Sequence, residues 1–450
     1  MRRGFLTRLD TPSSRPKSSS VKASQNSTKR TPLGAIQPPP VSVAEAAPPT
    51  VLTPIPDGHV GCCERVGLSE LLKILRNAGE NTPPPQPVIF QIPSKASRPD
   101  ETVTTCITIP EAREKLLARG PYPAIDWQEG CRIRVVDVPG KGKGCVSTGA
   151  IPRGALIIRE RPLVIAPTVM AFPGNFDRTV AHAMPSDART ALLSLNNCYE
   201  DKIIGVLRTN NWGVGALPGH DAPYGGTGAI ISRINHRCVH IWLLNSAPFY
   251  LISRVANSCA PNALFRWNEE MFAAEVRALR PIARGEEVTM CYVPELEGYA
   301  SRQARLRDAY GFTCTCELCA RPAAARALSD ARHAQLESVT SHSDELPDAR
   351  LWAWARDVRA RDDALLGALE QQVAIMEQEL FVRPEGWLTA ARALVKIHCA
   401  LGNTVAARRW AVCAASYTRA ATGTDGGWEA VARNPEQTVW WGVRIKAGAR

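Results

Sequence analysis

The sequence predicts an α+β protein, with a β-rich domain over residues 131–320 and an α-helical domain over residues 321–450. Three observations support this division. From Cys131 onward, short apolar runs such as "RIRVVDV" and "ALIIRERPLVI" alternate with glycine turns, as strands do. Three cysteines crowd together just before Arg321, which is typical of a metal site. Beyond Arg321 the apolar residues recur with a period near 3.6, as on one face of a helix.

Residues 1–60 have the composition of a disordered arm, basic at first and then proline-rich. Most of the net charge of +11 lies in residues 1–30, where eight Lys or Arg side chains accompany only Asp10. A solvated arm is favoured over one that binds nucleic acid. No run of about 18 apolar residues predicts a membrane span, and the start lacks an apolar signal-peptide core. We therefore expect no membrane partner and a location in the nucleus or cytoplasm.

Residues 61–130 are predicted to be a short helix and a linker. Apolar spacing in "LSELLKILRNAG" predicts a helix over 68–79, and the following "NTPPPQPVIF" predicts a rigid spacer. Within the β-rich domain, the segment at 167–205 predicts a helical insertion, with Ser186 as a helix N-cap.

Residues 321–450 carry long Ala-, Leu- and Arg-rich runs, among them "WLTAARALVKIHCALGN" and "TVAARRWAVCAASYTRAATG". Gly402-Asn403 separates these two runs, and small alanines lie where two helices would meet. The pattern indicates an antiparallel helical pair of tetratricopeptide type, although only one such pair is evident in the sequence.

The segment "GFTCTCELCARP" places Cys314, Cys316 and Cys319 within six residues. Three thiolates from one loop suit zinc, and a structural zinc takes four ligands, so a fourth must come from elsewhere in the chain. The alternative is three reduced thiols in a loop. Most of the other cysteines are scattered singly and are expected to be reduced core residues.

Two further features are ambiguous when each is taken alone. Gly140, Gly142 and Gly144 alternate in "GKGKG", which lets a backbone approach a ligand closely but is equally a turn before a strand. No helix opens after it, so it is not a dinucleotide-binding fingerprint. Tyr292 closes the strand-like run "GEEVTMCYV", where a tyrosine is usually a core residue with its hydroxyl in water.

Residues 232–262 contain two copies of one motif, and each copy is incomplete. The first copy reads "RINHRC" and the second "RVANSCAPN". Removing the 21 residues 237–257 joins the two parts as "RINHSCAPN". The leading hypothesis is a retained intron, and the alternative is a genuine insertion.

In this order, the glycine turn, "RINH…SCAPN", "GEEVTMCYV" and "RLRDAYGFTCTCELC" resemble the segments of SET-domain protein lysine methyltransferases. The resemblance covers residues 131–320. The helical tail resembles the C-terminal domain of the SET-and-MYND branch. Cys62 and Cys63 are the only cysteines before Cys106, too few for a MYND zinc finger.

The resemblance implies a domain of small sheets with a zinc-binding post-SET segment, and methyl transfer from S-adenosyl-L-methionine to a protein lysine, histone or non-histone. Tyr292 would be the catalytic residue, and Cys259 the fourth zinc ligand beside Cys314, Cys316 and Cys319. Asn210 and Trp212 would line the substrate channel. The residues that the resemblance assigns to the cofactor are Gly142, Lys143, Gly144, Asn235, His236 and Phe312.

If residues 237–257 belong to the mature protein, the second motif copy competes for the place of the first. Ala256 and Asn257 would then stand where the family has Asn and His, and cofactor binding would be poor. Cys238 is the rival fourth zinc ligand if the first copy occupies the fold. The alternative function is a catalytically weak, zinc-stabilised interaction module.

Overall fold

A computed structural model places twelve stretches of the chain. They are residues 50–51, 86–94, 101–126, 130–138, 142–168, 175–197, 199–234, 261–290, 298–310, 313–340, 348–380 and 384–449. All of them belong to one compact unit, Pro40–Arg450. The helix predicted at 68–79, residues 237–257 and the basic part of the arm lie outside these stretches. Among the helices described, none is long and apolar enough to cross a bilayer.

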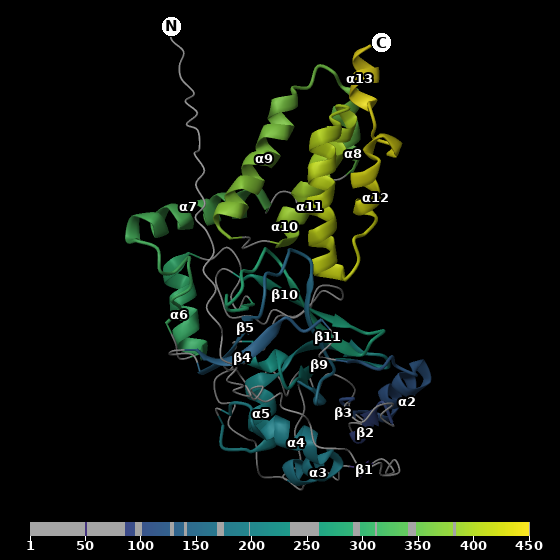
Figure 1. Cartoon of the computed structure of the whole chain (residues 1–450), viewed down its shortest axis with the longest axis vertical. Coiled ribbons are helices and arrows are strands. Elements are labelled where there is room, and N and C mark those ends of the chain that lie inside the picture. The colour runs from purple at the N-terminus through teal and green to yellow at the C-terminus, as the bar shows by residue number, and fades with distance from the viewer. Residues whose placement is uncertain are drawn as a thin grey trace, which may run out of the picture. The chain divides into compact units, whose positions relative to one another are not determined.

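The largest sheet has six strands in the order β1-β2-β3-β7-β9-β8. Figure 1 labels four of them, β1, β2, β3 and β9. Its strands are β1 (Thr50–Val51), β2 (Val88–Ile92), β3 (Thr104–Thr108), β7 (Val164–Pro167), β8 (Trp212–Leu217) and β9 (His220–Thr227). Neighbours are antiparallel except β3 and β7, which are parallel. Every residue of β3 is buried, as expected of a strand with neighbours on both edges and both faces covered.

The prediction of a linker is wrong for the second half of residues 61–130. There β2 and β3 pair with each other, and helix α2 (Pro110–Arg119) follows β3 after a single residue. Proline at the first helical position of α2 fits, because that residue needs no backbone donor. Prolines around "VIF" suggested a spacer, whereas pairing with a distant strand decides the structure.

Two smaller sheets complete the β-rich domain, as predicted. β4 (Ile133–Val138) and β5 (Gly142–Ser147) form an antiparallel hairpin, with Val136 opposite Gly144. The other sheet has the order β10-β11-β6. Its strands are β6 (Leu156–Glu160), β10 (Ala263–Asn268) and β11 (Ala273–Ala278).

The helical insertion is confirmed as α3 (Phe176–Ala183), α4 (Ser186–Leu193) and α5 (Ile203–Asn210). These helices bury their apolar faces against one face of the large sheet, in a cluster that includes Phe176, Val206 and Ile107. Ser186 is not the N-cap. It is the first helical residue of α4 after Pro185, and no side chain caps this end.

The described chain beyond Arg321 is mainly helical, as predicted, and one helix, α6 (Tyr299–Tyr310), precedes it inside the region predicted to be β-rich. The helices beyond Arg321 are α7 (Ala323–Thr340), α8 (Asp348–Arg356), α9 (Asp362–Gln378), α10 (Pro384–Ala400), α11 (Thr404–Thr422), α12 (Trp428–Arg433) and α13 (Val443–Gly448). Short 3₁₀ turns are η1 (Ile231–Arg233) and η2 (Pro435–Gln437).

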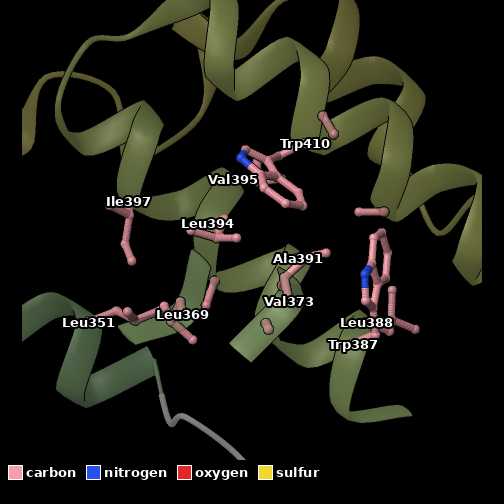
Figure 2. Packing of buried hydrophobic residues seen from close by; sticks show 14 of the residues in the cluster. Leu351, Leu369, Val373, Trp387, Leu388, Ala391, Leu394, Val395, Ile397 and Trp410 are labelled. Carbon is pink, nitrogen blue, oxygen red and sulfur yellow. The ribbon is translucent and has the colours of Figure 1, made fainter. Parts of the chain in front are cut away.

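Helices α10 and α11 form the predicted pair around the Gly402-Asn403 turn. Gly402 has φ +66°, and the Asn403 side chain caps α11 by accepting from the backbone N–H of Ala406 at 3.1 Å. Figure 2 shows the packing of Leu388, Ala391 and Trp410 inside this region. The tetratricopeptide type of the pair stays a prediction.

The turn between β5 and β6 packs directly on the helical region. The Arg153 guanidinium lies 5.2 Å from the ring centres of both Trp387 and Tyr417, which are stacked 4.2 Å apart. Gly154 has φ +78°, and a Cβ there would lie 2.5 Å from the carbonyl oxygen of Ser416 in α11. Only glycine allows this approach.

Candidate functional site

The hairpin of β4 and β5 presents the glycine turn. Gly142 is exposed with φ +73°, and a Cβ on it would contact nothing. Lys143 is also exposed, and its ammonium group pairs with Asp137 at 2.8 Å. Gly144 is buried beside Cys145. A Cβ at Gly142 would therefore meet open space, which leaves room for a ligand, and the predicted cofactor role of the turn stays a prediction.

Residues 286–290 line the other edge of β5. The Ser147 N–H donates to the Glu286 carbonyl at 2.9 Å, and the Val288 N–H donates to the Cys145 carbonyl at 2.8 Å. This segment leads directly toward Tyr292, which lies outside the described residues. The chain that precedes the predicted catalytic residue is thus fixed against the glycine-bearing strand.

Asn262, the last residue of "SCAPN", ties the motif to the same segment. Its Nδ2 donates to the Glu286 carboxylate at 2.9 Å and to the Glu287 carbonyl at 2.8 Å, and its Oδ1 accepts from the Thr289 N–H at 2.8 Å. The side chain uses its acceptor and both donors while only 1% of the residue is exposed. Sequence reasoning included Asn262 in the motif and gave it no role.

Glu160 fixes the turn that enters Asn235-His236. Its carboxylate accepts from the backbone N–H groups of Ile230 at 2.8 Å and Ile231 at 2.7 Å, at the start of η1. Burial raises the pKa of Glu160 to about 7, even though these hydrogen bonds favour the ionised form. Ile230 also borders β5, since its carbonyl lies 4.0 Å from Cys145 Sγ. Sequence reasoning missed Glu160.

Arg233, the first residue of the first motif copy, is anchored on both sides. Its Nε donates to the Ala229 carbonyl at 3.0 Å, and its Nη2 donates to the Ser194 hydroxyl at 2.7 Å. These bonds fasten the turn to the helical insertion. Asn235 and His236, which follow, lie outside the described residues.

Asn210 and Trp212 are both 2% exposed. Asn210 donates to the carbonyls of Val206 and Asn196 at 2.7 and 2.6 Å. Trp212 packs beside Phe265, with ring centres 5.1 Å apart. In this structure both residues support the core around η1, and their predicted channel role stays a prediction.

The three cysteines come together. The sulfurs of Cys314, Cys316 and Cys319 lie within 4.8 Å of one another, slightly wider than the spacing of about 4 Å expected around a tetrahedral zinc. Gln303 of α6 holds the loop by donating to the Cys314 carbonyl at 2.8 Å and accepting from its N–H at 3.0 Å. Three soft donors in one small space fit zinc. Cys259, the predicted fourth ligand, lies outside the described residues.

Residues 142–293 match the family model described as SET domain. This part of the chain is therefore similar to a SET domain. Histone-lysine N-methyltransferase set5 of Schizosaccharomyces pombe is 28% identical over 204 residues, which cover 45% of this chain and 55% of that protein. N-lysine methyltransferase SMYD2 of Homo sapiens is 41% identical over 76 residues, 17% of each chain. The chain thus spans about half the length of the set5 relative.

Among solved structures, the SET domain of LSMT bound to lysine and AdoHcy is similar with a TM-score of 0.23 and 12% identity. That comparison covers 75% of this chain and 95% of the other.

Beyond the SET domain, a buried carboxylate links the cysteine segment to the helices. Glu379, at the end of α9, pairs with Arg321 at 3.1 Å and Arg332 at 2.9 Å and lies 3.5 Å from His333. Its pKa is lowered to about 2, because hydrogen bonds from His333, Ser329 and Arg332 outweigh the burial that would raise it. Arg321 lies two residues after Cys319, so this cluster anchors the cysteine loop on its C-terminal side.

The predicted site residues of the SET domain therefore divide into two groups. Those that the structure places are Gly142, Lys143, Gly144, Asn210, Trp212, Cys314, Cys316 and Cys319. Those that lie outside the described residues are Asn235, His236, Cys259, Tyr292 and Phe312. What the structure adds is convergence, because the chain leading to His236 and the chain leading to Tyr292 both contact β5, and Asn262 at the end of the motif is bonded to the second of these.

Proposed function

We propose that this protein transfers a methyl group from S-adenosyl-L-methionine to a lysine of a protein substrate, histone or non-histone. The observation that carries the proposal is the convergence on β5, inside the matched SET domain, of two segments from distant parts of the chain, one of which is also bonded to Asn262 of the motif. The names of the set5 and SMYD2 relatives support the same reaction.

The residues of the glycine turn fit the proposed cofactor. Gly142 offers bare backbone, because no side chain covers it and a Cβ there would fill open space. Gly142, Lys143, Gly144, Asn235, His236 and Phe312 would hold S-adenosylmethionine, which supplies the methyl group on a sulfonium. The protein's own contribution is to position this group and the lysine amine, and to keep water out.

Tyr292 is the proposed catalytic residue, with its hydroxyl aligning the amine and the methyl group. The residues just before it support this role, because residues 286–290 are bonded to β5 on one side and to Asn262 on the other. Rigid anchoring a few residues away is what a positioning hydroxyl requires. Asn210 and Trp212 would support the channel wall from the core.

We also propose that Cys314, Cys316 and Cys319 hold a structural zinc together with Cys259, as a post-SET segment would. The three placed sulfurs supply all but one of the ligands that a structural zinc needs. Cys238 remains the rival fourth ligand. The basic arm, a nucleic-acid contact through it and a nuclear or cytoplasmic location remain proposals from the sequence alone.

Tyr292→Phe tests the catalytic proposal. Phenylalanine keeps the ring and removes only the hydroxyl, so folding should be preserved. If the hydroxyl acts in the transition state, methyl transfer should fall by roughly two orders of magnitude or more with cofactor affinity intact. Transfer is measured on a mixed protein substrate pool, and affinity by calorimetry with S-adenosylhomocysteine.

The test is made both on the full chain and on the chain lacking residues 237–257. Heat of S-adenosylhomocysteine binding from the shortened chain alone would favour an enzyme whose sequence retains an intron. Equal turnover with Tyr and Phe at 292 would remove the catalytic role. The interaction-module alternative predicts no cofactor binding by either chain, and the Ala256-Asn257 pair of the second motif copy is the feature that favours it.

A further inference from the structure

A groove of about 480 Å³ lies where the three-stranded sheet meets the end of α11. Strands β6, β10 and β11 each contribute an arginine to it, namely Arg159, Arg266 and Arg277. The lining also includes Trp267, Asn268 and Glu275 of the same sheet, and Thr422 and Thr424 at and just after the end of α11. The volume is in the range of sites that bind a ligand or a short segment of chain.

The sheet register explains why the arginines gather. Arg266 of β10 is directly opposite Glu275 of β11, and Glu275 is directly opposite Arg159 of β6. Side chains in one cross-strand row project from the same face and contact one another. Arg277, two residues along β11, joins this row.

The cross-strand row formed by Arg159, Arg266, Arg277 and Glu275 contains three positive charges and one negative charge. Glu275 is 1% exposed and accepts from Arg159 at 2.9 Å and from Arg277 at 3.2 Å, while Arg266 lies 3.9 Å away. Three guanidinium groups therefore surround one carboxylate. Arg266 also donates to the Thr422 carbonyl at the end of α11, where the helix dipole offsets about half a charge.

Charges on the rim do not remove the excess. Arg119 and Glu269 form a pair at 2.9 Å and cancel each other. Glu270 is exposed, so water and salt screen its charge. The arginines of the row are partly shielded: 11% of the Arg277 side chain, 19% of the Arg266 side chain and 31% of the Arg159 side chain remain exposed. Partly desolvated guanidinium groups in excess form a site that an oxyanion would complete.

We propose that this groove binds an oxyanion carried by a peptide segment of a partner protein, either a phosphorylated or a carboxylate side chain. Guanidinium groups fit both oxyanions through paired N–H donors. Asn268, Thr422 and Thr424 supply further polar groups along the same groove, and Trp267 supplies an apolar wall. A peptide can use all of these at once, whereas an isolated ion uses only the arginines. The proposal does not depend on methyl transfer.

Binding is tested on the full chain with fluorescein-labelled peptides of one mixed sequence, carrying phosphoserine, glutamate or glutamine at two adjacent positions. We expect the phosphoserine peptide to bind, with the glutamate peptide weaker and the glutamine peptide weakest. Arg159→Gln should weaken phosphoserine-peptide binding by about tenfold or more, because it removes a charge-assisted contact. Arg350→Gln removes the same charge from an exposed position of α8 and should leave binding unchanged.

Two measurements on the unmodified chain keep the proposal open to refutation should Arg159→Gln fail to fold. Inorganic phosphate at millimolar concentration should displace the peptide, and affinity should fall as salt rises. Equal binding of the phosphoserine and glutamine peptides would overturn the proposal. A single-stranded oligonucleotide that binds more tightly than any peptide, and whose binding is lost in Arg159→Gln but kept in Arg350→Gln, would assign the groove to nucleic acid and overturn the proposal as well. Binding of phosphate without binding of any peptide would show that the groove binds only free anions, and it would contradict the proposal that the groove binds a peptide.

Discussion

At the scale of single residues, Glu160 and Asn262 illustrate how the site is held by side chains that need not touch a substrate. Each satisfies backbone groups of a turn or strand from another part of the chain. A buried turn without such partners would leave unpaired N–H groups, each costing roughly 1–3 kcal/mol. Both residues are therefore positioning residues for the chain that carries His236 and Tyr292.

The raised pKa of Glu160 predicts a specific dependence of stability on pH. In the unfolded chain the carboxyl titrates near 4.5, whereas in the folded chain it titrates near 7. Between these values the folded state holds the proton more tightly, so stability should fall as pH rises from about 4.5 to about 7. The loss assigned to this group is roughly 3 kcal/mol.

Urea unfolding at several pH values checks this, with Glu160→Gln as the comparison. Glutamine does not titrate, so the difference in unfolding free energy between the two proteins should shrink toward high pH and be largest below pH 5. A parallel dependence in both proteins would show that other groups set the trend.

The roles of Gly142–Gly144 and of the three cysteines could be predicted from the sequence, because each set lies close together in the chain and its spacing alone suggests the chemistry. Glu160 could not be found in this way. It ends the strand "LIIRE", where a charged residue reads as the solvated end of a strand. Its role depends on Ile230 and Ile231, some 70 positions away.

At the scale of elements, strands and helices with a clear period were predicted, and those defined by a distant partner were not. The α10–α11 pair follows from apolar period and the Gly402 turn. β3 reads "TTCIT", too polar to suggest a buried strand, yet it pairs with β2 and β7 and all five residues are buried. The parallel partner β7 begins more than fifty residues later, and no local sequence pattern predicts that β3 and β7 pair.

Two glycines with positive φ, Gly154 in the turn between β5 and β6 and Gly285 in a turn after β11, offer a matched pair of substitutions. Gly154→Ala forces a Cβ against the backbone of Ser416 at a positive φ, whereas Gly285→Ala meets only the positive φ with nothing in contact range. We expect a loss of about 1–2 kcal/mol for Gly285→Ala. For Gly154→Ala an additional 1–3 kcal/mol is expected, roughly, from overpacking. Equal unfolding free energies by urea titration would show that the turn yields without displacing α11.

The loop that contains Cys314, Cys316 and Cys319 is predicted to bind one zinc ion. Purified without chelator, the chain should carry one zinc, measured by atomic emission, and Cys316→Ser should lose it and lower the melting temperature, since structural zinc contributes directly to folding. Cys413→Ser, in α11, is the matched control and should keep the metal. Loss of zinc from Cys259→Ser but not from Cys238→Ser would identify the fourth ligand. A zinc-free native chain would refute the site.

At the scale of the whole molecule, the SET domain and the helical region share apolar contacts. Leu279, directly after β11, is fully buried in the cluster formed mainly by α8 to α11, and its N–H donates to the Asn262 carbonyl at 2.8 Å. One residue thus connects the candidate site to the helical core. The sequence predicted the two regions but not this connection, because "RALRP" carries no periodic signal.

Leu279→Ala should therefore destabilise both regions together, by about 2–5 kcal/mol for a fully buried leucine. Leu193→Ala, at a half-exposed position of α4, is the control and should cost far less. Thermal unfolding followed by tryptophan fluorescence and by far-ultraviolet circular dichroism should give coincident transitions. Two separated transitions in the unmodified chain would show that the regions unfold independently.

Ile234 and Asn262 are both buried, and both are fixed by backbone hydrogen bonds, so they act as pinned ends of the sequence between them. The entropy lost when two pinned ends are joined by a flexible connection grows only with the logarithm of its length. In this loop-closure model, lengthening the connection from 6 to 27 residues by including residues 237–257 costs about 1.3 kcal/mol. A domain of this size can absorb such a cost and still fold. Melting curves of the long and short chains would be nearly the same, and only ligand binding would separate them.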